Sequence, residues 1–234
     1  MQESRILRTF LSANGALQPA ARKLMYEGWL KKHGFKDLIP LSGSCNVTYR
    51  ITADGTFHVA KLARDLFPEV RGGLIREAEI LKVLSGHPSL PRFAALYVDS
   101  PGSFASTGLN LIRHFRFHKD KITALLRHYI PGRSLNDNEN IEGKRNQRRL
   151  LEGVDAVHGI GYARLDISPR NIVLSDGGLA FLIDFETVVK ENEVTPEQFG
   201  KLKEIDYLML KVCFGSDQAE ADLFRLQRIV RGIQ

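Results

Sequence analysis

Two acids and an amide in the C-terminal half have the types and the spacing that phosphoryl transfer requires. Asp166 and Asn171 lie five residues apart, and Asp184 follows thirteen residues later, directly after the apolar run Leu179–Ile183. In phosphoryl transfer one carboxylate orients the attacking hydroxyl group and takes its proton, while an amide oxygen and a second carboxylate hold the magnesium ions that bridge the ATP phosphates. We therefore predict that Asp166 is the catalytic base and that Asn171 and Asp184 bind Mg²⁺.

A β-hairpin is predicted to bring these side chains together. The apolar runs Ile172–Leu174 and Leu179–Ile183 flank Ser175–Gly178, whose two glycines favour a tight turn. Such a hairpin would place the loop that carries Asp166 and the acid Asp184 at the same end. The alternative, a buried strand followed by an incidental acid, is common for a single motif, but the joint pattern favours a site.

Elements earlier in the chain supply a lysine at the end of a strand. We expect a first strand, a turn at Ser42–Ser44, a second strand over Val47–Ile51, an Asp54–Gly55 turn, and a third strand that ends at Lys61. Lys61 would contact the α and β phosphates of ATP. A lone lysine at a strand end is usually solvated, and only its order relative to Asp166 favours this role.

A helix that follows Lys61 carries two candidate acidic partners. Its apolar face is formed by Leu74, Ala78, Leu81 and Leu84. Glu77 lies beside this face and is predicted to form a charge-assisted contact with Lys61, sixteen residues earlier. Glu79 is the alternative. It lies about 200° from Glu77 on a helical wheel, so only one of the two can face the site.

With these motifs the chain resembles the protein kinase-like superfamily from about Leu38 to Leu210. The resemblance implies an α+β, two-lobed fold, with a small N-terminal lobe of antiparallel sheet and one helix and a reduced, mainly helical C-terminal lobe. It divides the chain into an N-terminal helical extension (1–36), an N-terminal lobe (37–126), and a hinge with the C-terminal lobe (127–234). It also implies ATP and Mg²⁺ as cofactors and a hydroxyl-bearing acceptor.

The resemblance further implies a nucleotide site. The expected contacts are Gly43, Ser44, Asn46, Val59, Ala60, Lys61, His128, Ile130 and Leu174. Backbone atoms of His128 and Ile130, in a hinge over 127–132, would meet the adenine edge. Val59, Ala60 and Leu174 would help to line the adenine pocket. Asn46 would hydrogen-bond the phosphate-covering loop or a phosphate.

The motifs depart from the common family pattern in three ways. Arg164 stands where most relatives have histidine, and Leu165 replaces an arginine that binds phosphorylated activation loops, so control by such phosphorylation is not expected. Asp184 and Phe185 are followed by Glu186 instead of glycine, which resembles the aminoglycoside and choline phosphotransferases, the RIO kinases and the lipopolysaccharide kinases. Because glycine freedom is lost there, we expect a site held in one state.

Only 48 residues follow Glu186, too few for a long activation segment and a full peptide-docking platform. The run Glu204–Phe214 predicts one buried helix. Within it, Asp206 stands where the resemblance implies an acid that braces the catalytic-loop backbone; a plain acid at a helix start is the alternative. A closing amphipathic helix is predicted over 221–233.

Composition limits the remaining possibilities. With 234 residues and 43% hydrophobic content the chain can bury the core of one two-lobed domain. Cys45 and Cys213 have no metal-ligand spacing, and no signal peptide or membrane span is found, so we expect a cytoplasmic protein. A net charge of +6 suggests an anionic partner, with the basic run Lys144–Arg149 as either a solvated helix face or a contact for RNA, ribosome or lipid-linked sugar.

Residues 2–33 contain two helical patterns separated at Asn14–Gly15, the second running from Pro19 to Leu30 before Gly34. We expect these helices to pack on the small lobe. A membrane-surface or partner-binding amphipathic helix is the alternative.

Three functions are consistent with these residues. The first is a small atypical Ser/Thr-type protein kinase that uses ATP and Mg²⁺. The second is a sugar, lipopolysaccharide or other small-molecule kinase with the same chemistry. The third is a pseudokinase that serves as a binding scaffold, which Arg164 keeps open. Because lysine, base and both metal ligands are all present, an active enzyme is favoured.

Overall fold

The computed structural model describes residues 23–41, 47–64, 68–99, 122–136, 139–141 and 143–231. After a helix over 23–32, the elements are β1 (Lys36–Leu41), β2 (Val47–Ala53), β3 (Thr56–Arg64), α2 (Pro68–Val83), β4 (Phe93–Asp99), β5 (Ile122–His128), β6 (Gly132–Ser134), α3 (Lys144–Gly159), β7 (Tyr162–Ala163), β8 (Ile172–Ser175), β9 (Ala180–Leu182), β10 (Val189–Lys190), α4 (Pro196–Cys213) and α5 (Asp217–Arg231). The predicted α+β class is confirmed.

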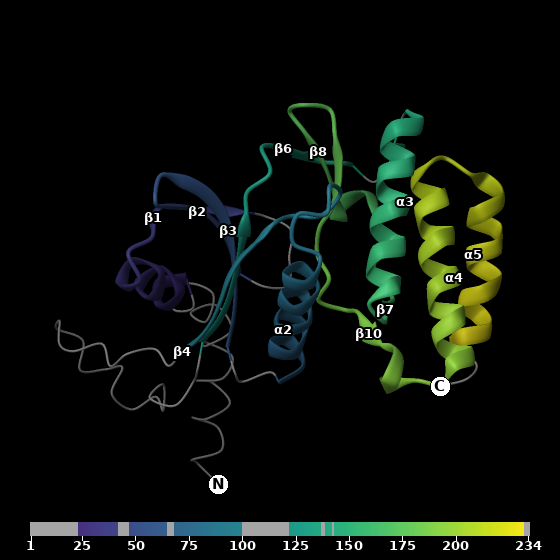
Figure 1. Ribbon diagram of the computed structural model, residues 1–234, viewed down its shortest axis with the longest axis horizontal. Coiled ribbons are helices and arrows are strands. Elements are labelled where there is room, and N and C mark those ends of the chain that lie inside the picture. Colours follow the sequence, from purple (N-terminus) through teal and green to yellow (C-terminus); the bar gives the residue numbers. More distant parts are fainter. Residues whose placement is uncertain are drawn as a thin grey trace, which may run out of the picture.

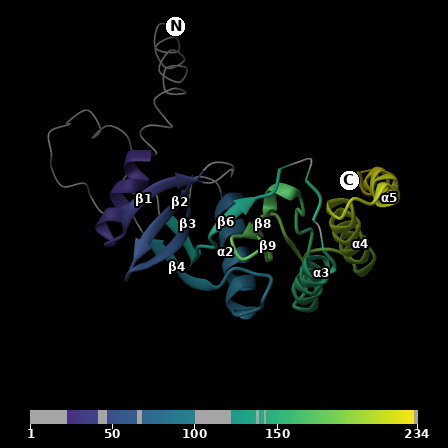
Figure 2. The same cartoon turned by 90° about the horizontal axis from the view of Figure 1, so that it is seen from above.

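The largest unit is an antiparallel five-stranded sheet in the order β1-β2-β3-β5-β4. Its central pair, β3 and β5, aligns Lys61 with Leu125 and Ala60 with Leu126. Since successive side chains of a strand point to opposite faces, Lys61 and Leu125 share one face while Ala60 and Leu126 share the other. Both views place α2 between this sheet and the helices α3 to α5 (Figures 1 and 2).

The two sheet faces belong to different hydrophobic cores. One core contains Leu125 together with α2, α3 and the hairpin residues Ile172 and Leu182. The other core contains Ala60 and Leu126 and is covered by Trp29 and Leu30 from the helix over 23–32. The larger core therefore joins the sheet to the helical part of the chain, on the face that carries Lys61.

The N-terminal prediction is confirmed where the chain is described. Residues 23–32 are helical, Gly34 follows with a φ of +81°, and Trp29 packs edge-on against Tyr97 of β4 with ring centroids 5.8 Å apart. The helix therefore packs on the sheet, as expected. The first predicted helix, up to Asn14, lies outside the described residues.

The predicted hairpins are confirmed. The β8–β9 pair aligns Val173 with Phe181, and Gly178 closes its turn with a φ of +73°. Asn146 of α3 fixes this turn because its Nδ2 donates to the Gly178 carbonyl at 3.1 Å. The turn at Asp54–Gly55 between β2 and β3 has both residues at positive φ, as a type I′ hairpin turn requires.

One strand boundary was predicted wrongly. The third strand was expected to end at Lys61, but β3 continues to Arg64. It continues because Leu62 and Ala63 are buried, one in each core, and pair with β5 residues. Lys61 therefore lies inside the sheet, where its position is fixed on both sides.

The C-terminal helices follow the predicted order. Thr195 caps α4, its hydroxyl accepting the Gln198 N–H at 3.2 Å, and Pro196 occupies the first turn. Helix α5 packs beside α4 (Figure 1). Among the described residues, none of the helices has the length and apolar character needed to cross a bilayer.

Candidate active site

Lys61 and Glu77 form a buried ion pair between β3 and α2. The Lys61 Nζ lies 2.7 Å from the Glu77 Oε2, and the two residues are 2% and 0% exposed. The predicted pairing is therefore confirmed. Glu79 points elsewhere, because its carboxylate accepts the Tyr162 hydroxyl at 2.6 Å and lies 2.9 Å from the Lys190 Nζ.

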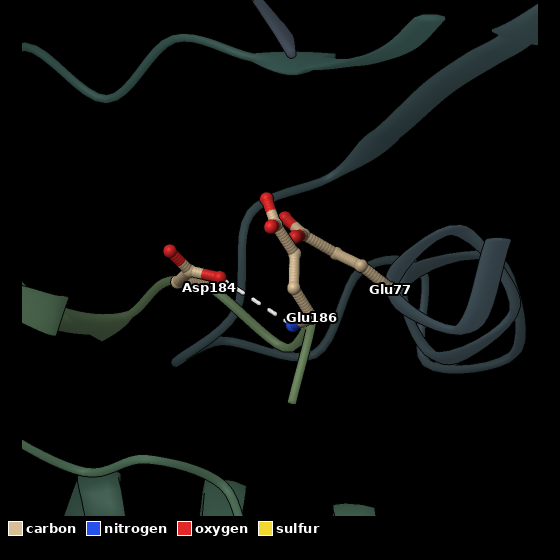
Figure 3. Close-up of side chains that lie close together, drawn as sticks. All are labelled: Glu77, Asp184 and Glu186. Carbon is tan, nitrogen blue, oxygen red and sulfur yellow. Dashed lines mark hydrogen bonds between the residues drawn. The ribbon is translucent and has the colours of Figure 1, made fainter. Parts of the chain in front are cut away.

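Two further carboxylates surround the same ammonium group. The Lys61 Nζ lies 3.1 Å from the Asp184 Oδ1 and 2.9 Å from the Glu186 Oε1. Figure 3 shows Glu77, Asp184 and Glu186 converging, with the Glu186 N–H directed at the Asp184 Oδ1 at 3.4 Å. The expected proximity of Asp184 to Lys61 is found. The contact with Glu186 was not predicted.

Arg127 is a second cation at this site, and sequence reasoning missed it. It lies opposite Val59 in the β3–β5 register, on the face that carries Lys61, and its Nε is 3.8 Å from the Glu77 Oε1. It is 5% exposed. The available signal was an arginine directly after the mainly apolar run Ile122–Leu126. We call the following five residues the charged cluster: Lys61, Glu77, Arg127, Asp184 and Glu186.

Burial and charge act against each other in this cluster. Burial alone would lower the pKa of Lys61, but the carboxylates of Glu77, Glu186 and Asp184 outweigh it, and the pKa is raised. Burial lowers the pKa of Arg127 against the effect of the same acids. Burial raises the pKa of Glu186; Lys61 opposes this shift, whereas Asp184 and Glu77 add to it. Lys61 is thus a cation at neutral pH.

The loop that carries the predicted base is connected to the cluster. The Asn171 Nδ2 donates to the Asp166 backbone carbonyl at 2.9 Å and lies 3.3 Å from its Oδ2. The Ile183 N–H donates to the Asn171 carbonyl at 2.9 Å, directly before Asp184. Asp166 is exposed, whereas Asn171 and Asp184 are half-buried. Neighbouring backbone bonds therefore join all three residues of the sequence motif.

Backbone strain concentrates in the same loops. Arg164, Asp166 and Asp184 have φ values of +65°, +49° and +74°. Residues other than glycine are uncommon in this region, and each costs on the order of 1–3 kcal/mol unless the surrounding structure holds it. Strain of this kind is typical of functional loops.

Asp206 of α4 provides part of that support. Its carboxylate is 0% exposed and accepts the backbone N–H groups of Arg164 at 2.9 Å and Leu165 at 2.8 Å. The His158 Nε2 lies 2.9 Å from the same side chain. The predicted bracing of the loop backbone is confirmed. The alternative of a helix-start acid is wrong, because Asp206 lies inside α4.

Helix α2 is fixed at two residues that precede Glu77. The Arg76 Nη1 donates to the Val188 carbonyl at 2.8 Å. At Gly73 the helix approaches the chain so closely that an added Cβ would lie 2.7 Å from the Glu186 carbonyl oxygen. These contacts hold α2 against the segment that follows Asp184.

Ala60, which was predicted together with Val59 to line the adenine pocket, lies on the sheet face opposite Lys61. Its side chain packs with Tyr49 and Leu126 in the core on the opposite sheet face. Adjacent strand residues cannot share a face, so Val59, and not Ala60, lies on the Lys61 side.

The other predicted nucleotide contacts stay predictions. His128 is exposed, and its N–H donates to the Arg92 carbonyl at 2.9 Å. Ile130 and Leu174 are half-buried. Three positions of the predicted phosphate-covering loop lie outside the described residues: Gly43, Ser44 and Asn46.

The donor chemistry fits Mg²⁺ at Asp184 and Asn171. The Asn171 Nδ2 is engaged by Asp166, which leaves its amide oxygen for a cation beside a carboxylate. The carboxylates of Glu77, Asp184 and Glu186 also lie within 4.8 Å of one another. The Lys61 ammonium group already lies among these three carboxylates. Together they therefore bind the lysine side chain.

A surface hollow of about 450 Å³ lies elsewhere, lined by Ile160, Gly161, Tyr162, Lys190, Glu191 and Asn192. None of these residues belongs to the charged cluster. Tyr162 and Lys190 instead contact Glu79 on α2. The charged cluster therefore does not line this hollow.

The basic run Lys144–Arg149 opens α3 and is partly explained by structure. Arg148 pairs with Glu152 at 2.8 Å, and the Arg149 guanidinium lies over the Phe181 ring at 4.7 Å. For Arg148 and Arg149, these contacts favour the prediction that the basic run is a helix face and not a binding surface. An anionic partner stays a prediction.

Comparison of the chain with known protein families finds no match, and neither does comparison with curated protein sequences. The functional conclusion therefore depends on the charged cluster and on the loop that carries Asp166.

Proposed function

We propose that the protein is an ATP- and Mg²⁺-dependent phosphotransferase with a two-lobed, protein kinase-like fold. The observation that carries the proposal is the position of Lys61, which lies 2.7 Å from Glu77 of α2 and 3.1 Å from Asp184. These residues come from three separate segments, and their order in the chain was the basis of the sequence prediction. A sheet lysine that meets both acids is the arrangement this chemistry needs.

Each residue has a role that follows from its chemistry. Lys61 binds the phosphates, and Glu77 keeps its ammonium group in place. Asn171 and Asp184 hold Mg²⁺, which neutralises charge on the transferring phosphate. Asp166 is exposed on a strained loop, where its carboxylate can take a proton from an incoming hydroxyl group.

The acceptor is a hydroxyl group, and we favour a protein serine or threonine. Helices α4 and α5 follow the site, and Asp206 of α4 is committed to the catalytic-loop backbone. Because Asp166 is exposed, a hydroxyl group on a macromolecule can reach it.

Nucleotide binding and transfer test the proposal separately. Mg-ATP at 100 times its dissociation constant should stabilise the protein by about 2.7 kcal/mol in thermal unfolding. With radiolabelled ATP and a panel of protein and sugar acceptors, Asp166→Ala should keep this stabilisation and lose transfer. Asp176→Ala removes an exposed acid from the β8–β9 turn and serves as the matched control. Lack of stabilisation by Mg-ATP, or transfer that persists in Asp166→Ala, would contradict the assignment.

A further inference from the structure

Arg127 is a buried cation whose hydrogen-bond donors the protein itself does not use. The residue is 5% exposed, and a guanidinium group carries five N–H donors. The Glu77 Oε1 lies 3.8 Å from the Arg127 Nε, too far for a hydrogen bond, and none of the described residues accepts a hydrogen bond from the guanidinium group. Buried polar groups normally have hydrogen-bond partners. The donors of Arg127 are therefore available to a ligand.

Arg127 lies one step along the sheet from the residues that bind the phosphates. It is opposite Val59, whereas Lys61 is opposite Leu125, two residues away on each strand. Side chains two residues apart share a face, and the step measures about 7 Å. A ribose ring can bridge such a distance. A nucleotide whose phosphates bind at Lys61 and Asp184 would therefore bring its base beside Val59 and Arg127.

The net charge of the charged cluster favours a neutral acceptor at Arg127. Three acids and two cations give the cluster a net charge of −1. A further anion beside Glu77 would add to this charge, whereas a nucleobase is uncharged. Adenine and guanine both present N7, a hydrogen-bond acceptor, on one edge of the ring. Arginine has donors only and forms this kind of contact with purines.

We infer that Arg127 is a specificity residue that donates a hydrogen bond to N7 of a purine nucleotide. This inference rests on the proposed function. Glu77 offsets the charge of the guanidinium group without accepting a hydrogen bond from it, so the donors stay available for the base. Hydrogen bonds to charged groups are stronger than those between neutral groups. A base without an acceptor at this position loses that contribution.

Two ligands that differ only at N7 test the inference. In 7-deaza-ADP a C–H group replaces N7 of ADP, while the phosphates, the ribose and the other base edges are the same. Isothermal titration with each ligand in excess Mg²⁺ gives an affinity ratio, the Kd of 7-deaza-ADP divided by the Kd of ADP. For the wild-type protein we expect a ratio of about ten, the effect of one hydrogen bond to a charged donor.

Substitutions at Arg127 separate base recognition from a structural role. Arg127→Met removes every donor and should lower the ratio to about one. If the arginine only supported the fold, both affinities would fall together and the ratio would stay the same. Arg127→Lys keeps the charge beside Glu77 but loses the planar guanidinium group, so its ratio should also fall; it covers the case of a poorly folded Arg127→Met. Arg148→Met removes an arginine whose side chain is 82% exposed on α3 and should keep the wild-type ratio.

The remaining outcomes contradict one proposal or the other. Equal binding of ADP and 7-deaza-ADP by the wild-type protein would overturn the inference and leave the proposed function standing, because nucleotide would still bind. A wild-type ratio that persists in both Arg127 variants would assign N7 recognition to another residue and also overturn the inference. If neither ligand binds to the wild-type protein or to any variant, the proposed function itself fails.

Discussion

Replacing Asp206 by alanine should destabilise the fold and disable the loop that carries Asp166. The carboxylate is fully buried and meets the N–H groups of Arg164 and Leu165 and the His158 ring at 2.8–2.9 Å. Each buried donor left without a partner costs about 1–3 kcal/mol. Water can reach the exposed end of the loop and recover part of this loss, so we expect a net decrease in unfolding free energy of about 3–5 kcal/mol.

Urea denaturation of Asp206→Ala, followed by circular dichroism, measures this loss. The control is Asp155→Ala on neighbouring α3, whose carboxylate is exposed and accepts the Tyr207 hydroxyl at 2.7 Å. Its loss should stay within about 1 kcal/mol. Phosphotransfer by Asp206→Ala, measured where the variant is still folded, should fall further than the folded fraction does. A stability loss below about 1 kcal/mol would refute the bracing role, because the three donors would then have had equivalent partners elsewhere.

Two further predictions concern packing and pH. Gly73→Ala should lower the unfolding free energy by about 1–3 kcal/mol because of its clash with the Glu186 carbonyl, whereas Gly72→Ala, with no atom within 4 Å, should raise it by up to about 1 kcal/mol. If denaturation curves show that both substitutions change the unfolding free energy in the same direction, this prediction is contradicted. Burial raises the pKa of the Cys213 thiol from 9.0 to about 11. The folded state then favours the neutral thiol, so its stabilising contribution is complete below pH 9 and is lost as pH rises toward 11, by about 2 kcal/mol. Between pH 9 and pH 11 the denaturation midpoint of Cys213→Ala should fall less steeply than that of the wild-type protein. If the two midpoints fall in parallel, groups other than Cys213 cause the loss of stability.

Local sequence predicted the elements that hold the site. The β8–β9 hairpin follows from two apolar runs around a glycine turn, and helical periodicity separates Glu77 from Glu79. Both depend on short-range rules, the turn chemistry of glycine and the angle between residues on a helix. Asp206 was found only through its resemblance to a family position, since no local rule sends an acid inside a helix to a loop 41 residues earlier.

The missed features depend on which face of the sheet meets which element. Strand alternation alone places Val59 and Ala60 on opposite faces, so only one of them can lie beside Lys61. Arg127 could not be placed, because its approach to Glu77 requires the β3–β5 register. The Glu186 contact requires the approach of α2 at Gly73, which no spacing along the chain reveals.

The charged cluster is difficult to explain as a means of stabilising the fold. Buried ion pairs lose in desolvation much of what they gain in attraction, and apolar side chains of similar volume are often at least as stabilising. Here Lys61, Glu77 and Arg127 are at most 5% exposed, in a core that otherwise packs apolar residues. The strained backbone at Asp166 and Asp184 adds a further cost. Three buried charges and a strained backbone nearby favour a chemical role, because a purely structural junction would be more stable without them.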